Sequence, residues 1–377
     1  MNSKKKKYLF LYLKTGGGHL APARSVANYI NKYKSDEVET VLADGFEKTK
    51  PFARFIVEDG YRILQNKSKW VYEWIYAFHK IKFISQISAF LVSINIEKYL
   101  RELFAKEQPD KIIVFHFFLI KPVYKILKKL KMDIPVIIVV TDPYIAHPLW
   151  FLNKQKNFIV FSEELKNRCI KSGIEKNRLN VFPLILDEKF SKTPSEEEIK
   201  NYKIKHSFKK ENILLIMGGG DGIPHGETIL QNLLKLKIDF EIAFVCGKNK
   251  KLYNYAMQIK EKEKLGNLKV YGYVDFVYEL LSICDIVITK CGASTFMEIL
   301  MMKKVPLVNS YIWEQEKGNV DFLRNNKLGI YEKRIHKLPE IVQELFSDKN
   351  KLNEYKNNIK NYNFENGTAK VAEFIFK

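Results

Sequence analysis

The chain has 377 residues, of which 46% are hydrophobic and 28% are charged. This length exceeds what one hydrophobic core normally supports, so two globular domains are expected, and the composition excludes a disordered or fibrous protein. The net charge of +20 favours a polyanionic partner such as nucleic acid, anionic lipid or a phosphorylated substrate, although a lysine-rich composition from an AT-rich genome would give the same charge.

The cysteines and the N-terminus indicate a reducing compartment and no membrane span. No C-x-x-C pair or His/Cys cluster occurs, so neither a metal site nor a disulfide framework is expected. Lysines 4–7 and the apolar residues 8–13 resemble a signal peptide, but they lead directly into a glycine cluster and therefore predict a first buried strand. No apolar run reaches the roughly 18–20 residues needed to cross a bilayer, so we expect a cytoplasmic protein that lies on a membrane where it meets one. The cysteines are Cys169, Cys246, Cys284 and Cys291.

The first half of the chain alternates buried strands with helices, which predicts a parallel, doubly wound sheet. Helices are expected at residues 21–33 and 121–130. The expected strands are residues 8–13, 39–42, 111–115, 135–140, 157–161 and 180–182.

A glycine cluster, Thr15-Gly16-Gly17-Gly18-His19, follows the first strand. Glycines at a strand-to-helix turn let the backbone approach a ligand, and the helix N-terminus offers free N–H groups. The pattern also loosely fits a dinucleotide fingerprint, with Asp44 as its acidic residue, so a nicotinamide or flavin enzyme competes at this point. His19 has no use in that fingerprint, but it could accept a proton from a hydroxyl group; the simpler alternative is that it caps or packs.

Residues 51–104 interrupt the alternation, because they are aromatic and basic and contain no clear strand. Within them, the uncharged stretch 83–96 is too short to cross a bilayer and suits a buried or interfacial helix. Trp and Tyr are favoured at membrane interfaces, so the segment predicts lipid contact, with ordinary packing over the sheet as the alternative. The flanking aromatic and basic residues are Trp70, Tyr72, Trp74, Tyr76, Phe78, Lys80 and Lys82.

A polar segment at residues 191–210 predicts a linker, after which the alternation restarts. Two Rossmann-like domains facing a cleft, over residues 1–195 and 205–350, are the simplest architecture, with a helical tail at 351–377. The first domain carries the 51–104 insertion. The expected strands of the second domain are residues 212–217, 240–246, 268–271, 285–289 and 305–309, and late helices are expected at 337–346 and 350–362.

Three motifs of the second domain have side chains or turns suited to a nucleotide sugar. Gly218-Gly-Gly-Asp-Gly222 follows a strand but satisfies neither the dinucleotide nor the P-loop pattern. The turn Lys290-Cys-Gly-Ala-Ser-Thr295 precedes a helix whose start suits a diphosphate, and Glu298 could bind ribose hydroxyls. Residues 313–319 are expected to form a polar loop whose carboxylates and amides suit sugar hydroxyls.

Taken in order along nearly the whole chain, these motifs are similar to those of the monogalactosyldiacylglycerol synthase and processive diacylglycerol glucosyltransferase family. That family resembles in turn the N-acetylglucosaminyltransferase of peptidoglycan synthesis, whose longer glycine signature is not matched here. The matching motifs are Thr15-Gly-Gly-Gly-His19, Val140-Thr-Asp-Pro143, His147-Pro-Leu-Trp150, Gly218-Gly-Gly-Asp-Gly222, Thr289-Lys-Cys-Gly-Ala-Ser-Thr295 with Glu298, and Gln315-Glu-Lys-Gly-Asn319.

The resemblance implies a GT-B fold and inverting transfer of galactose or glucose from a UDP-sugar to diacylglycerol, with no cofactor. No D-x-D sequence occurs, so no metal-bridged diphosphate is expected. It implies His19 and Asp142 as base or base-orienting pair, and membrane association at the inner face of the cell membrane. The implied acceptor-binding residues are Gly17, Gly18, His147 and Trp150. The implied donor-binding residues are Gly219, Gly220, Gly292, Ser294, Thr295, Glu298, Gln315, Glu316 and Asn319.

Departures from the family pattern concern the donor sugar. Cys291 stands where many relatives have Pro, Ala293 replaces a second Gly, and Trp313-Glu314 replaces a Pro-Gly. Alternatives are a non-catalytic UDP-sugar sensor at the membrane, a transferase for another lipid acceptor, and an oxidoreductase that uses the first glycine turn. A nucleic-acid binder fits the charge alone, because no recognition motif is present.

Overall fold

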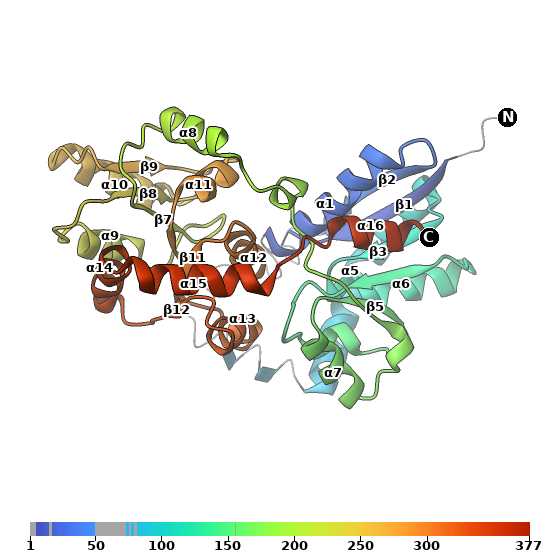
Figure 1. Ribbon diagram of the computed structural model, residues 1–377. Helices are drawn as coiled ribbons and strands as arrows, with labels where there is room; N and C mark the ends of the chain where they lie inside the picture. Colours follow the sequence, from blue (N-terminus) through green and yellow to red (C-terminus); the bar gives the residue numbers. More distant parts are fainter. Residues whose placement is uncertain (1–4, 15–16, 50–72, 75–76, 79–80, 155) are drawn as a thin grey trace. The chain divides into compact units, whose positions relative to one another are not determined.

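In the computed structural model, the chain forms two compact α/β units (Figure 1). Met1–Glu188 together with Asn366–Lys377 form the first unit, and Lys189–Glu365 form the second. The structure describes residues 5–14, 17–49, 73–74, 77–78, 81–154 and 156–377. Most of residues 51–80, the first part of the aromatic and basic segment predicted at 51–104, therefore lies outside the described residues.

The first unit is built on a six-stranded, all-parallel sheet in the order β2-β1-β3-β4-β5-β6. All six strands predicted for this half are confirmed. The strands are β1 (Lys6–Tyr12), β2 (Val38–Asp44), β3 (Lys111–Val114), β4 (Val136–Val139), β5 (Asn157–Val160) and β6 (Leu179–Val181). The α-helices are α1 (Gly17–Tyr33), α5 (Lys82–Glu107), α6 (Phe117–Leu130), α7 (Glu163–Lys171) and α16 (Thr368–Phe376), and the 3-10 helices are η2 (Pro148–Phe151) and η3 (Lys176–Arg178).

The second unit repeats this plan with a parallel sheet in the order β12-β11-β10-β7-β8-β9. Five of its strands were expected, and the short β12 was not. The strands are β7 (Ile213–Met217), β8 (Glu241–Val245), β9 (Leu268–Tyr271), β10 (Ile286–Lys290), β11 (Val305–Ser310) and β12 (Ile330–Tyr331). The helices are α8 (Glu196–Lys205), α9 (Gly226–Leu233), α10 (Lys250–Lys262), α11 (Val277–Ile283), α12 (Ala293–Met301), α13 (Trp313–Asn325), α14 (Leu338–Ser347) and α15 (Lys349–Tyr362), with the 3-10 helices η4 (Glu188–Ser191) and η5 (Ile335–Lys337).

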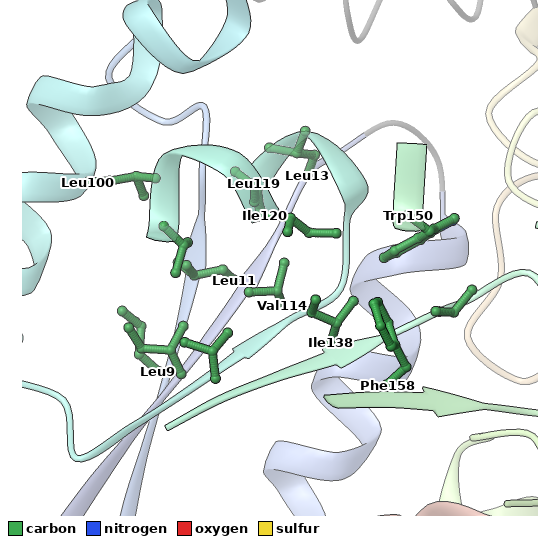
Figure 2. Close-up of a cluster of buried hydrophobic side chains, with 14 of the residues drawn as sticks. Leu9, Leu11, Leu13, Leu100, Val114, Leu119, Ile120, Ile138, Trp150 and Phe158 are labelled. Carbon is green, nitrogen blue, oxygen red and sulfur yellow. The ribbon is translucent and has the colours of Figure 1, made fainter. Parts of the chain in front are cut away.

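Alternation along β1 buries both faces of the first sheet. Leu9, Leu11 and the following Leu13 enter a core cluster with α5 and α6 (Figure 2). On the opposite face, Phe10 stacks on Phe115 with ring centroids 6.0 Å apart. Successive side chains of a strand point to opposite faces, so a parallel strand covered on both sides is apolar at nearly every position.

The expected tail at 351–377 is divided between the two units, because its two helices have different partners. Helix α15 belongs to the second unit, whereas α16 returns to the first unit and packs on α1. The hydroxyl group of Tyr8 donates to the Phe376 carbonyl oxygen at 3.1 Å, and Lys111 Nζ donates to the Ile375 carbonyl oxygen at 2.6 Å. These two donors satisfy carbonyl groups at the end of α16 that have no partner within the helix.

The predicted linker at 191–210 is largely helical. Helix α8 begins with a capping box, in which the Glu198 backbone N–H donates to Ser195 Oγ and the Ser195 backbone N–H donates to the Glu198 carboxylate. After the helix, the buried Glu241 carboxylate of β8 accepts the backbone N–H groups of Lys209 and Lys210 at 2.6 and 2.8 Å. The segment is thus held by caps and charge-assisted hydrogen bonds although it is polar.

The first core predicts a clear stability difference between two leucines. Leu11 is fully buried, so Leu11→Ala should lower the free energy of unfolding by about 2–5 kcal/mol, because it removes apolar burial and leaves a cavity. Leu91→Ala on the exposed side of α5 should change it by less than about 0.5 kcal/mol. Urea unfolding followed by tryptophan fluorescence measures both; equal effects would contradict this packing.

Candidate functional site

The first unit places polar residues where its strand order reverses. From β1 the chain continues to β2 on one side, and then crosses to β3 on the other side of β1. In open parallel sheets, ligands bind outside the carboxyl ends of the strands at such a switch point. Here His19 follows β1, His116 follows β3, and Thr141 and Asp142 follow β4, so three neighbouring strands direct these residues to one edge.

His19 lies in the first turn of α1, is buried, and has a defined tautomer. Its Nδ1 is 2.8 Å from the Phe115 carbonyl oxygen and 2.9 Å from Thr141 Oγ1. A carbonyl oxygen can only accept, so Nδ1 carries the proton and the lone pair of the neutral ring is on Nε2. Burial lowers the pKa of His19 from 6.5 to about 4, and the Phe115 hydrogen bond partly opposes this shift. The imidazole is therefore neutral at physiological pH.

His116 is a second buried imidazole, and it belongs to none of the sequence motifs. Its ring lies edge-on to that of His19, with centroids 4.5 Å apart. It caps α6, because its Nδ1 accepts the Phe118 backbone N–H at 3.2 Å, which leaves the proton on Nε2. Burial and the neighbouring His19 hold the pKa of His116 well below its usual value. The only signal in the sequence was its position directly after a buried strand.

Asp142 and Trp150 form a buried hydrogen-bonded pair beside His19, and His147, between them in the sequence, is also buried. The Trp150 indole Nε1 donates to Asp142 Oδ2 at 2.8 Å, and the indole ring centroid lies 6.3 Å from that of His19. His147 caps η2 by accepting the Leu149 backbone N–H at 3.1 Å. Trp150 is 1% exposed, so its surface is used for packing. The acceptor-contact roles of His147 and Trp150 and the catalytic role of Asp142 stay predictions.

Gly17 and Gly18 begin helix α1 and are exposed. Among the described residues, no atom outside the adjoining helix backbone lies within 4 Å of the position that a Cβ would take at either residue, so this side of the first turn is open to approach. Thr15 and Gly16 lie outside the described residues. The helix begins earlier than expected, so Pro22 falls in its second turn. The free N–H groups of a first turn are suited to polar ligand atoms.

The second unit also reverses its strand order, beside β7. Strands β8 and β9 extend the sheet on one side of β7, and β10 and β11 lie on the other. The segments after β7, β10 and β11 contain every predicted donor-binding residue. These three strands are neighbours, so the topology brings motifs that lie nearly a hundred residues apart to one sheet edge.

The glycine loop after β7 has an open side and a packed side. Gly219 has a φ of +79°, and a Cβ there would meet no atom of the described residues within 4 Å other than those of its chain neighbours; the same holds for Gly220. Gly222 has a φ of +78°, and its Cβ would stand 2.6 Å from the Cys246 carbonyl oxygen after β8. The left-handed backbone and the close approach of Gly222 to the Cys246 carbonyl oxygen both require glycine. The other side of the loop, at Gly219 and Gly220, stays accessible to a ligand.

The turn after β10 is shorter than the sequence suggested, because helix α12 already begins at Ala293. Gly292 is its N-cap residue, and Ser294 and Thr295 lie in its first turn. Free N–H groups and hydroxyls therefore occur together at a helix N-terminus, the arrangement that favours a diphosphate. Glu298 lies one turn further along the helix.

Residues 313–319 are helical, which corrects the expected polar loop. Glu316 Oε2 accepts the Ile312 backbone N–H at 2.7 Å, so the carboxylate caps the start of α13, and its Oε1 is 3.9 Å from Lys290 Nζ. Asn319 is buried and donates from Nδ2 to the Cys291 carbonyl oxygen at 2.8 Å. Glu316 and Asn319 thus join the β10 turn to α13, and Gln315 lies in the first turn of the same helix. The donor-binding roles stay predictions.

Within the described parts of the chain, no group of three or more His, Cys, Asp or Glu side chains is arranged to hold a metal ion. The four cysteines are buried and unpaired. Burial raises the pKa of the Cys291 thiol well above its usual value. Cys291 is therefore a neutral thiol behind the turn after β10.

The low pKa of His19 predicts a pH-dependent stability. The unfolded chain binds a proton near pH 6.5 and the folded chain near pH 4, so stability is complete above pH 6.5 and is lost as the pH falls towards 4. The loss attributable to this residue is about 3 kcal/mol. Chemical unfolding between pH 7 and pH 4 should give a flatter pH profile for His19→Asn than for the wild type; parallel profiles would contradict a buried, neutral His19.

Comparisons with known proteins cover both units. Residues 19–184 match the family model of monogalactosyldiacylglycerol (MGDG) synthase, and residues 213–373 match the glycosyltransferase family 28 C-terminal domain. The probable chloroplastic monogalactosyldiacylglycerol synthase of Nicotiana tabacum is 28% identical over 90% of this chain. The processive diacylglycerol beta-glucosyltransferase of Bacillus subtilis is 26% identical over 99% of this chain and 95% of its own length. The chain spans 64% of the length of the tobacco relative.

Solved structures share the fold over the whole chain. MurG of Acinetobacter baumannii has a TM-score of 0.60 at 15% identity and covers 98% of this chain and 99% of its own. Anabaena Alr3699/HepE, solved in complex with UDP-glucose, has a TM-score of 0.59 at 14% identity and covers 98% of each chain. With two parallel α/β units, the switch-point motifs and these matches, the chain has the GT-B fold; its first unit matches the monogalactosyldiacylglycerol synthase family model, and its second unit matches the glycosyltransferase family 28 C-terminal domain.

Proposed function

We propose that the protein transfers a galactose or glucose residue from a UDP-sugar to the hydroxyl group of diacylglycerol, with inversion at the anomeric carbon. The names of the relatives from tobacco and Bacillus subtilis support this substrate pair. The observation that carries the proposal is the hydrogen bond from His19 Nδ1 to the Phe115 carbonyl oxygen. It leaves a basic Nε2 on a neutral imidazole at the switch point of the first sheet.

The switch point of the second unit supports binding of the donor there. The open backbone of Gly219 and Gly220 and the first turn of α12 offer N–H groups and hydroxyls to a diphosphate. Such donors stabilise negative charge as it develops on the departing UDP. We assign Glu298 to binding of the ribose hydroxyls and Gln315 to binding of the sugar hydroxyls.

The reaction needs one proton acceptor and one anion site. As the acceptor hydroxyl oxygen forms its bond to the anomeric carbon, the hydroxyl proton moves to His19 Nε2. The bond from the anomeric carbon to the diphosphate oxygen breaks, and its electron pair leaves with UDP. Because the His19 pKa is about 4, the base is unprotonated throughout the neutral range.

His19→Ala should lower kcat by about a hundredfold or more, because it removes the proton acceptor, and should leave KM for the UDP-sugar within about threefold. The assay measures UDP release and glycolipid formation with UDP-galactose or UDP-glucose and vesicles that contain diacylglycerol. His336→Ala, at an exposed histidine of η5, is the matched control and should retain full turnover.

Two outcomes would contradict this assignment. Unchanged kcat in His19→Ala would remove the base role. A wild-type protein that binds UDP-sugar but makes no glycolipid with either donor would support the non-catalytic sensor instead.

The exposed face of α5 supports peripheral contact with a membrane. Phe83 is 70% exposed, and four further apolar side chains follow it along one side of the helix. Lys121 of α6 donates to the Gln86 carbonyl oxygen and lies 5.2 Å from the ring centroid of Phe90. Apolar side chains beside a lysine, in a chain of net charge +20, fit an anionic bilayer surface, and we place the protein at the inner face of the cell membrane. The other four are Ile87, Phe90, Leu91 and Ile94.

Among the described residues, no helix is long and apolar enough to cross a bilayer. The double variant Phe83→Ser/Leu91→Ser should reduce partitioning to vesicles by about tenfold or more, because two exposed apolar side chains are removed from the bilayer contact. Co-sedimentation with vesicles of phosphatidylglycerol or phosphatidylcholine measures this, and wild-type binding should be stronger to the anionic vesicles at low salt. Ile204→Ser, an equally exposed position on α8, is the control. Equal binding by all three proteins would exclude α5 as the contact.

A further inference from the structure

The Nδ1 nitrogen of His19 has two uncharged hydrogen-bond acceptors, and one of them, Thr141, is not among the predicted site residues. The Phe115 carbonyl oxygen fixes the proton on Nδ1, so Thr141 Oγ1, at 2.9 Å, also accepts that N–H. Phe115 follows β3 and Thr141 follows β4. The ring of His19 is therefore held from two neighbouring strands, and a single N–H is shared between two acceptors.

We infer that Thr141 is a positioning residue for the proposed reaction: its hydroxyl oxygen orients the His19 ring and stabilises the imidazolium that forms when Nε2 takes the acceptor's proton. The inference rests on the proposed function. A hydrogen bond to the charged form of a group favours that form, and the bond strengthens when its donor becomes a cation. Thr141 is buried, so this bond is shielded from competing water.

The groups around His19 determine how much the Thr141 hydroxyl contributes to stabilising the imidazolium. Among titratable groups, His116 at the start of α6 packs on the ring and is neutral because its pKa lies well below the usual value. The Asp142 carboxylate accepts the indole N–H of Trp150, whose ring also faces His19. A hydroxyl and a carbonyl are weaker partners for an imidazolium than a carboxylate, in agreement with a base whose pKa stays low.

The test compares Thr141→Val, which keeps the side-chain shape without the hydroxyl, with Thr141→Ser, which keeps the hydroxyl. In Thr141→Val, kcat should fall about ten- to a hundredfold with an unchanged KM for the UDP-sugar. The pKa of His19, followed by nitrogen NMR of the histidines in the intact protein and assigned with His19→Asn, should fall further. Thr141→Ser should stay within about twofold of the wild type in kcat and should keep the His19 pKa.

Several results would overturn the inference. Unchanged kcat and His19 pKa in Thr141→Val would do so, and so would Thr141→Ser losing as much turnover as Thr141→Val, because the methyl group would then be what matters. A wild-type His19 protonated on Nε2 would overturn it without any variant, even if Thr141→Val failed to fold. The NMR measurements need no turnover, so a wild type without transferase activity but with the expected tautomer and pKa shift would refute the proposed function alone.

Discussion

The reversal of strand order beside the first strand of each sheet is the constraint on which both candidate sites depend. In the first unit, β1 has β2 on one side and β3 on the other; in the second unit, β7 has β8 on one side and β10 on the other. One connection leads to the strand on one side, and a later connection leads to the strand on the other side. No single connection therefore covers the carboxyl ends of the strands at the reversal. The histidine pair and the glycine loop are found at these two reversals.

Burial then sets the chemistry of the first site. His19 and His116 pack edge to face and both stay neutral, because desolvation disfavours a cation more than the Phe115 carbonyl favours it. In each ring, one nitrogen forms a hydrogen bond with the backbone. His19 donates to a carbonyl oxygen, whereas His116 accepts from an N–H group. Two adjacent histidines therefore have opposite tautomers, and only His19 has its lone pair on Nε2.

The second site is formed mainly by backbone. The left-handed Gly219, the helix start at Gly292 and the capping carboxylate of Glu316 arrange N–H groups and hydroxyls around one sheet edge. Asn319, predicted as a donor contact, is buried and holds the Cys291 carbonyl. A motif residue can thus shape the turn on which a ligand contact depends.

The sequence alone determined eleven of the strands, the two-unit plan and the position of the glycine motifs. It could do so because the signals are local: apolar runs that are separated by glycine turns and charged helices. The uncharged stretch at residues 83–96 predicted a buried or interfacial helix, and only the structure showed which of its apolar side chains on α5 are exposed. The importance of His116 and Thr141 was decided only by the tertiary structure. Phe115 and Thr141 lie 96 and 122 residues from His19 in the chain, and only the order of β1, β3 and β4 in the sheet brings them to its imidazole.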